Sequence, residues 1–125
     1  IGARNEGAFE YSDKRFLPLM PRKLELENRM AIASTSHRDS QTDEWLLAHN
    51  VTKTIRAGSS VKFCLIASGE ADFYPRFGPT MEWDTAAGDA ILRAAGGMTY
   101  TSDDAQFQYG KDAYRNTAFI AKAQP

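Results

Sequence analysis

The sequence lacks the features that mark several specialised classes of protein. Its 125 residues include one cysteine, Cys64, so no disulfide can form within the chain, and we expect a reducing compartment such as the cytoplasm. No apolar run is long enough to cross a membrane, and no signal-peptide pattern is visible; peripheral attachment at the inner membrane stays open. Basic and acidic residues nearly balance, at 15 and 16, which argues against binding to a nucleic acid polymer.

Motifs that reveal a catalyst by spacing alone are also missing. The chain has no Ser-His-Asp arrangement, no cysteine–histidine metal spacing and no P-loop. Its hydrophobic share of 42% and aromatic share of 11% are typical of a globular domain. Because the first residue is Ile1 and not a methionine, we expect a processed product or one piece of a longer chain.

Strand and helix patterns alternate after an irregular beginning. Glycines and prolines punctuate residues 1–30, which predict a hairpin around Gly7 and an extended connector at 16–21. Strands are then predicted at 30–34, 51–55, 71–74, 98–101 and 117–121, with Pro75 limiting the third. Helices are predicted at 43–49, 59–68 and 84–95. This alternation predicts a layered α/β domain.

The beginning of the predicted helix at 59–68 suits an anion. Gly58 precedes it, Ser59 stands in its first turn, and Lys62 follows three residues later. That spacing would place the hydroxyl and the ammonium on one side of a helix, beside free backbone N–H groups that attract a phosphate. An ordinary serine cap next to a solvated lysine explains the same pattern, so both interpretations stay open.

Three further side chains are candidates for a ligand site. Asp84 starts the predicted helix at 84–95, where it can cap the helix or point outward as an oxygen ligand for magnesium. His37 lies in a polar loop after a strand, a common place for a ligand contact. Arg76 follows a tyrosine and a proline, and its guanidinium suits a phosphate. A solvated histidine and a surface arginine are the alternatives.

Taken together, these motifs resemble a known family. The run 83–88 (Trp-Asp-Thr-Ala-Ala-Gly), with Ile91 and the run 94–97 (Ala-Ala-Gly-Gly), is similar to the carboxyl-terminal signature of the inositol monophosphatase superfamily. The stretch 58–67, followed by Gly69 and by residues 71–72 and 74–80, is closer to its 3′(2′),5′-bisphosphate nucleotidase branch, as are 34–37 and 109–111. Inositol monophosphatases proper usually carry an acidic residue where Arg76 stands here. The resemblance extends from about residue 31 to residue 121.

The resemblance implies a fold, an activity and a role for each candidate residue. Residues 1–30 would belong to the preceding domain, and residues 31–125 would form a carboxyl-terminal, substrate-binding α/β domain with a central mixed β-sheet flanked by helices. The implied activity is the magnesium-dependent hydrolysis of adenosine 3′,5′-bisphosphate to AMP and phosphate. Asp84 would ligate Mg²⁺, and the substrate-binding residues would be His37, Gly58, Ser59, Lys62 and Arg76.

One part of the family pattern does not occur in these 125 residues. In the family, most metal ligands lie in the preceding half, as a glutamate and an Asp-Pro-(Ile or Leu)-Asp-Gly-Thr loop. We therefore expect no phosphatase activity from this chain alone and expect the missing amino-terminal half as its partner, with a homodimer left open. Two alternatives also stay open: a phosphatase of the same superfamily that acts on an inositol or sugar phosphate, and a non-catalytic nucleotide- or anion-binding module.

Overall fold

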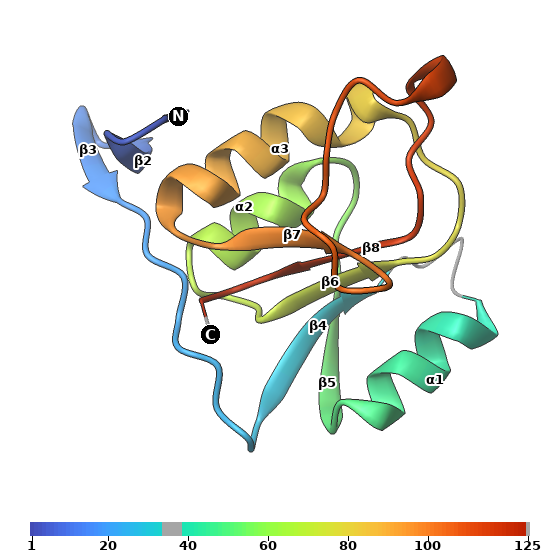
Figure 1. Ribbon diagram of the computed structural model, residues 1–125. Helices are drawn as coiled ribbons and strands as arrows, with labels where there is room; N and C mark the ends of the chain where they lie inside the picture. The colour runs from blue at the N-terminus through green and yellow to red at the C-terminus, as the bar shows by residue number, and fades with distance from the viewer. Residues whose placement is uncertain (34–38, 125) are drawn as a thin grey trace.

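Two β-sheets organise the chain in a computed structural model that describes residues 1–33 and 39–124 (Figure 1). The first is antiparallel and consists of β1 (Gly2–Ala3), β2 (Gly7–Ser12) and β3 (Arg15–Pro18). The second has the strand order β5-β4-β6-β8-β7. Its strands are β4 (Arg29–Ala33), β5 (Val51–Arg56), β6 (Phe73–Arg76), β7 (Met98–Thr101) and β8 (Phe119–Lys122).

Among the described residues, three α-helices flank the five-stranded sheet. In Figure 1, α2 (Val61–Ala67) and α3 (Glu82–Ala95) lie on one face, and α1 (Ser40–Ala48) lies on the other. A short 3-10 turn, η1 (Asp112–Tyr114), interrupts the connection from β7 to β8. β4 runs parallel to β5 and β6, whereas β8 runs antiparallel to β6 and β7. The prediction of a layered α/β fold with a mixed central sheet is therefore confirmed.

Side chains of the central sheet alternate between two apolar layers. In β4, Ile32 joins the core under α2 and α3, while its neighbour Ala31 joins the core under α1. This alternation follows from the two-residue period of a strand. Phe63 and Leu92 anchor the first layer, and Leu46 anchors the second. With both faces covered, the loops at the strand ends are left to carry exposed functional groups.

Gly88 brings α2 and α3 into direct contact. A Cβ atom at this position would lie 2.6 Å from Cδ2 and 3.0 Å from Cβ of Phe63. The Phe63 ring is itself fixed by aromatic neighbours, with Tyr74 edge-on at 5.5 Å and Phe119 stacked at 6.1 Å. Since the residue before Phe63 is Lys62 and the helix turn before Gly88 carries Asp84, this packing sets the spacing between two candidate site residues.

All three described α-helices begin away from their predicted starts. α1 begins at Ser40 and not at residue 43, with Asp39 as its cap. α2 begins at Val61, because Ser59 has a left-handed backbone conformation with a φ of 55° and cannot be part of a helix. The prediction that Ser59 lies on the first turn of that helix is therefore wrong. α3 begins at Glu82 and not at Asp84, which occupies the third helical position. The predicted end of α3 is confirmed, since Gly96 is the left-handed cap with a φ of 101°.

Pro75 lies inside β6 and does not end it as predicted. β6 pairs with β4 only at Phe73, whereas it pairs with β8 along its whole length. Pro75 thus lies beyond the part of β6 that is bonded to β4. Its missing N–H therefore removes no hydrogen bond between these two strands. The described part of the chain contains no helix with the length and apolarity needed to span a bilayer.

Candidate functional site

A cleft of about 560 Å³ opens at the carboxyl ends of β5 and β6, beside the first turns of α2 and α3. In open sheets with parallel strands, ligands bind at such carboxyl ends. The residues that line the cleft come from four segments of the chain: Arg56–Ser60, Lys62 with Phe63, Tyr74 with Arg76, and a last group of Pro79, Thr80, Trp83, Asp84 and Thr85.

Positive charge dominates the lining of the cleft. Three basic side chains, Arg56, Lys62 and Arg76, face one carboxylate, that of Asp84. Three cations against one anion attract a ligand that carries more than one negative charge. The cleft therefore has the electrostatic character of a site for a phosphorylated compound.

Lys62 is the most buried of the three cations. Its exposed fraction is 8%, and its Nζ donates a long hydrogen bond of 3.4 Å to the hydroxyl of Tyr74. The same ammonium lies 4.8 Å from the centre of the Tyr74 ring, which adds a cation–π contact. Burial lowers the pKa of Lys62, and the charge of Arg76 lowers it further. No carboxylate pairs with Lys62 among residues 1–33 and 39–124, so an anionic ligand would relieve this burial cost.

Arg76 keeps most of its donors for a ligand. Its Nη2 donates to the carbonyl oxygen of Pro79 at 3.3 Å, and its buried Nε has no hydrogen-bond partner among the described residues. A buried N–H without a partner is costly, and a bound anion is one way to satisfy it. The Arg76 charge also helps to lower the pKa of Asp39, although bonds from Thr42 are the larger cause.

Asp84 caps α3 and lines the cleft at the same time. Its Oδ2 accepts a hydrogen bond of 2.9 Å from the backbone N–H of Met81, the residue just before the helix. The two roles considered for Asp84 from the sequence are therefore compatible, because a carboxylate has two oxygens and the cap uses Oδ2. The cap also fixes the direction of the side chain before any ligand arrives.

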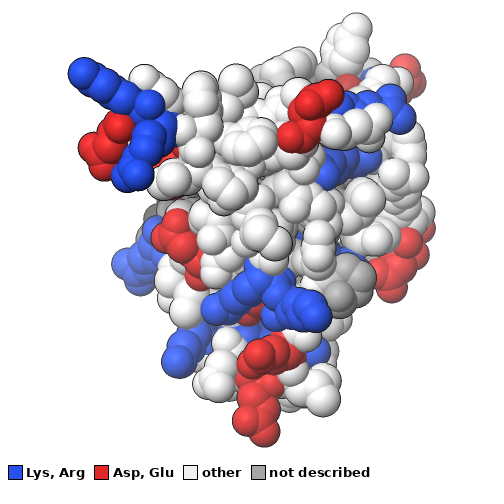
Figure 2. All heavy atoms as spheres, turned by 90° about the vertical axis from the view of Figure 1, so that its left-hand side faces the viewer, with Lys and Arg blue, Asp and Glu red and all other residues white. Residues whose placement is uncertain are grey.

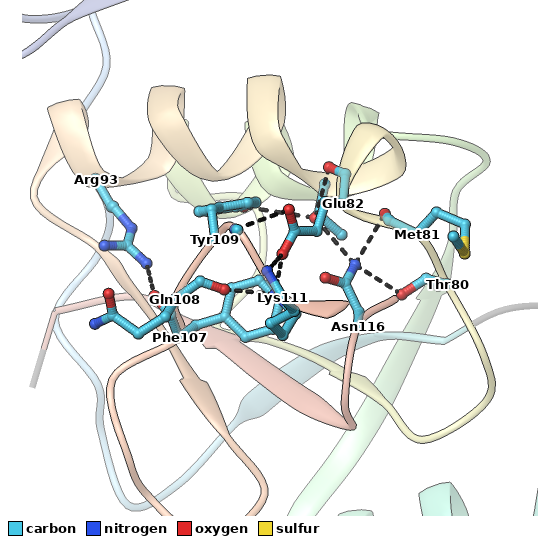
Figure 3. A network of polar contacts seen from close by, with 11 residues as sticks. Thr80, Met81, Glu82, Arg93, Phe107, Gln108, Tyr109, Lys111 and Asn116 are labelled. Atoms are coloured by element: carbon cyan, nitrogen blue, oxygen red, sulfur yellow. Dashed lines mark hydrogen bonds and ion pairs between the residues drawn. The ribbon is translucent and has the colours of Figure 1, made fainter. Parts of the chain in front are cut away.

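A polar network holds the first turn of α3 against the loop that follows β7 (Figure 3). The Glu82 carboxylate accepts from the backbone N–H groups of Gly110 and Lys111, each at 3.0 Å, and pairs with the Lys111 ammonium at 2.7 Å. These bonds, the one from the Lys111 side chain first, lower the pKa of Glu82 to about 2. Glu82 is thus turned away from Asp84 and has a structural role.

Asn116 ties the same turn to the loop before it (Figure 3). Its Nδ2 donates to Oγ1 of Thr80 at 3.1 Å, to the carbonyl oxygen of Met81 at 2.9 Å and to Oγ1 of Thr85 at 3.2 Å. Thr80 and Thr85 both line the cleft. One buried amide therefore fixes the wall of the cleft that carries Asp84.

The structure brings five of the six predicted site residues into one cleft. Gly58, Ser59, Lys62, Arg76 and Asp84 all line it, while His37 lies outside the described residues. The reasoning from helix spacing was wrong for Ser59, which comes before α2; Ser59 nevertheless lines the cleft.

Several lining residues were not predicted as site residues, among them Arg56, Tyr74 and Trp83. Arg56 directly follows the strand predicted at 51–55 and lies two residues before Gly58, a position that could have identified it as a site residue. Tyr74 and Trp83 each stand next to or near a predicted site residue, but an aromatic residue beside a site is more often part of the core.

The described residues do not make a complete magnesium site. They contain no group of three or more histidine, cysteine, aspartate or glutamate side chains placed to hold a metal ion. Magnesium prefers six oxygen ligands and is usually held by one or two carboxylates together with waters and substrate phosphates. The Asp84 carboxylate is suited to be one such ligand. Any further protein carboxylates would have to come from residues other than the described ones that line the cleft.

Comparisons with known proteins agree with the fold and the motifs. A sequence profile for the inositol monophosphatase family matches residues 1–124. The 3′(2′),5′-bisphosphate nucleotidase CysQ of Escherichia coli strain K12 is 41% identical over 91 residues, which cover 72% of this chain and 37% of that protein. An uncharacterized protein in the pss 5′ region of Rhizobium leguminosarum bv. phaseoli is 61% identical over 67 residues, covering 54% of this chain and 70% of that one.

A solved structure extends the likeness to three dimensions. CysQ from Bacteroides thetaiotaomicron, a bacterial member of the inositol monophosphatase family, superposes with a TM-score of 0.73 and 42% sequence identity. The match covers 85% of this chain and 41% of the other. The matches thus cover 37% and 41% of the length of these two CysQ proteins.

Proposed function

The chain belongs to the inositol monophosphatase family, and on that basis we propose that it is the carboxyl-terminal, substrate-binding part of a magnesium-dependent phosphomonoester hydrolase. The cleft at the carboxyl ends of β5 and β6 carries this proposal, because three cations and one carboxylate converge there. A non-catalytic anion-binding module would need the cations but would have no use for Asp84 aimed at the same space.

For the substrate we propose a nucleoside 3′,5′-bisphosphate such as adenosine 3′,5′-bisphosphate. Two phosphate groups need more than one cationic contact, and Arg56, Lys62 and Arg76 supply three. Identity of 41% and 42% to the two CysQ proteins supports this choice over an inositol or sugar phosphate. Hydrolysis would give the nucleoside 5′-monophosphate and inorganic phosphate.

The residues of this chain would bind and orient the substrate. Lys62 and Arg76 would hold phosphoryl oxygens, with Ser59 as a neutral hydroxyl donor, and Gly58 would let the backbone come close to the ligand. A Cβ at Gly58 would meet nothing within 4 Å, so the space above its backbone is open. Positioned cations stabilise the charge that spreads over the phosphoryl oxygens when a phosphate ester breaks.

Asp84 would contribute one ligand to the metal. When bound, magnesium supplies a Lewis acid for the phosphoryl group and lowers the pKa of a coordinated water. Since the described residues offer only this one carboxylate in the cleft, we propose that the 125-residue chain has no turnover by itself.

The partner that completes the site would be the amino-terminal half of the same enzyme. β3 is exposed along its length, and its outer edge has no strand partner among the described residues. Tyr11 and Phe16 contact each other on the same hairpin, with tilted rings whose centres are 5.0 Å apart, although both are more than 60% exposed. Figure 2 looks onto this side of the molecule and shows uncharged side chains between the charged groups at its upper left and upper right.

Residues 1–30 would then belong to the preceding domain, with β1–β3 as part of its sheet. An open strand edge next to exposed aromatic side chains is a liability in an isolated protein, and pairing with further strands would remove it. The intact mass of the protein in its source cells tests this part of the proposal. A mass equal to that of the 125 residues would contradict it.

A substrate panel tests the activity. The complete enzyme is incubated with magnesium and, in separate reactions, adenosine 3′,5′-bisphosphate, adenosine 3′-monophosphate and inositol monophosphate, and released phosphate is measured. We expect the bisphosphate to be hydrolysed with the highest kcat/KM. Equal values for all three substrates would remove the nucleotidase assignment, and no release from any of them would remove the hydrolase.

A further inference from the structure

We propose that Tyr74 is a further ligand-binding residue of this cleft, whose hydroxyl donates a hydrogen bond to a phosphoryl oxygen of the bound substrate. The proposal rests on the function proposed above and adds a neutral donor beside the cations. Tyr74 lies in β6, two residues before Arg76, and its side chain lines the cleft.

The direction of the hydroxyl proton follows from its neighbour. A phenol hydroxyl offers one donor and two acceptor positions, whereas an ammonium can only donate. In the contact of 3.4 Å between Lys62 and Tyr74, the ammonium must therefore be the donor and the phenol oxygen the acceptor. The single proton of Tyr74 has to point elsewhere, and the space that its side chain lines is the cleft.

The ring holds this hydroxyl in place. Tyr74 is 5% exposed, with Phe63 edge-on at 5.5 Å and Phe119 edge-on at 5.4 Å, so the ring is packed from two directions. Only rotation about the C–O bond remains to the hydroxyl, which gives a donor that loses little freedom on binding a ligand. A bond accepted from a cation also makes the phenol a better donor to an anion.

The surroundings keep the proton on the oxygen. Burial is the largest influence on Tyr74 and raises its pKa; the Arg76 charge opposes this, and the Asp84 charge adds to it. The phenol is therefore protonated throughout the neutral range and can donate. Lys62, Tyr74 and Arg76 then make three successive donors along one wall, of which only the middle one is uncharged.

The test compares two tyrosine-to-phenylalanine substitutions. Tyr74→Phe removes the hydroxyl and keeps the packed ring. Tyr100→Phe is the matched control, because Lys122 lies over the Tyr100 ring at 4.1 Å, yet neither residue lines the cleft. Affinity of the enzyme for adenosine 3′,5′-bisphosphate and for inorganic phosphate is measured by calorimetry without magnesium, so that no turnover occurs, and thermal unfolding is followed in parallel.

Loss of a hydrogen bond to a charged group predicts a Kd about tenfold higher or more for Tyr74→Phe. The same factor is expected for inorganic phosphate, since the contact is to the phosphate and not to the nucleoside. Tyr100→Phe should leave both affinities unchanged. Equal affinity of Tyr74→Phe and wild type would overturn the role of Tyr74 and leave the proposed function standing. If the wild type binds neither ligand, the proposed function fails, and this inference fails with it.

Discussion

Replacing Gly88 by alanine tests how the two helices beside the cleft are held together. The new Cβ would lie 2.6 Å from Cδ2 and 2.9 Å from Cγ of Phe63, whereas carbon atoms attract one another best at about 3.5–4.0 Å. Phe63 cannot easily give way, because it is 1% exposed and packs against Tyr74 and Phe119. One of the helices must therefore shift.

Two opposing effects decide the size of the loss. Overpacking a filled core costs about 1–3 kcal/mol. Alanine is a better helix former than glycine, which returns about 1 kcal/mol. Since the close atoms include the Cβ of Phe63 and not just the end of a flexible chain, we expect the upper part of the range and a net destabilisation of about 1–2 kcal/mol. For a domain of this size the midpoint of thermal unfolding would fall by roughly 3–10 °C.

Thermal and urea unfolding of the purified protein measure this loss. Gly58→Ala is the matched control, because the same methyl group would meet nothing within 4 Å at that position. We expect the control to unfold within about 2 °C of the wild type, corresponding to less than about 0.5 kcal/mol. A Gly88→Ala variant as stable as the wild type would refute the reasoning, since it would mean that α2 and α3 do not pack this closely.

Three other substitutions probe the site and its support. Glu82→Gln should lower the midpoint of thermal unfolding at pH 7, and its difference from the wild type should shrink as pH falls from about 5 towards 2. The reason is that the pKa of Glu82 is lowered to about 2 in the folded protein, so its stabilising effect is present above the unfolded pKa and lost as pH falls. A difference at pH 3 as large as that at pH 7 would contradict this. Asp84→Asn should reduce kcat of the complete enzyme at least 100-fold, about 2.7 kcal/mol. The midpoint of unfolding should change little, because the amide oxygen still accepts the hydrogen bond from the N–H of Met81. Near-normal turnover would mean that Asp84 is a helix cap and no metal ligand. Arg76→Ala should weaken binding of a bisphosphate by about tenfold or more, and binding of a monophosphate by less; equal losses would count against a role in holding a second phosphate.

The fold could be predicted from local patterns because each pattern maps onto one element. β7 lies at the predicted residues, and α3 ends at the predicted glycine. The errors at the helix starts share one cause, which is that a helix start depends on the conformation of single residues. A serine at position 59 is typical of a helix start. Its left-handed φ of 55° belongs to the turn that follows β5, and the residue type does not indicate this conformation.

The site was harder to predict than the fold because its residues come from separate segments that meet only in the folded chain. Residues 56–62 and 74–85 are separate in sequence, and they meet because β5 and β6 flank β4 in parallel. The spacing of residues within one segment does not indicate which other segment lies beside it in the fold. The resemblance to a family does indicate this. Conversely, Arg56 and Tyr74 have no distinctive spacing, and only the shared cleft identifies them.

The position of Asp84 explains how a helix cap and a ligand can be one residue. An aspartate at the N-cap position would direct its carboxylate forward, to the N–H groups of the first helical turn. Asp84 is instead at the third helical position and reaches back to the N–H of Met81 with Oδ2. This bond fixes the rotamer, and Glu82 and Asn116 fix the turn on which the side chain stands. A preorganised oxygen costs less to bring to a ligand than a mobile one. The groups that stabilise the start of α3 thus also hold the Asp84 carboxylate at the cleft. A substitution at Asn116 would therefore disturb the cleft, although Asn116 does not line it.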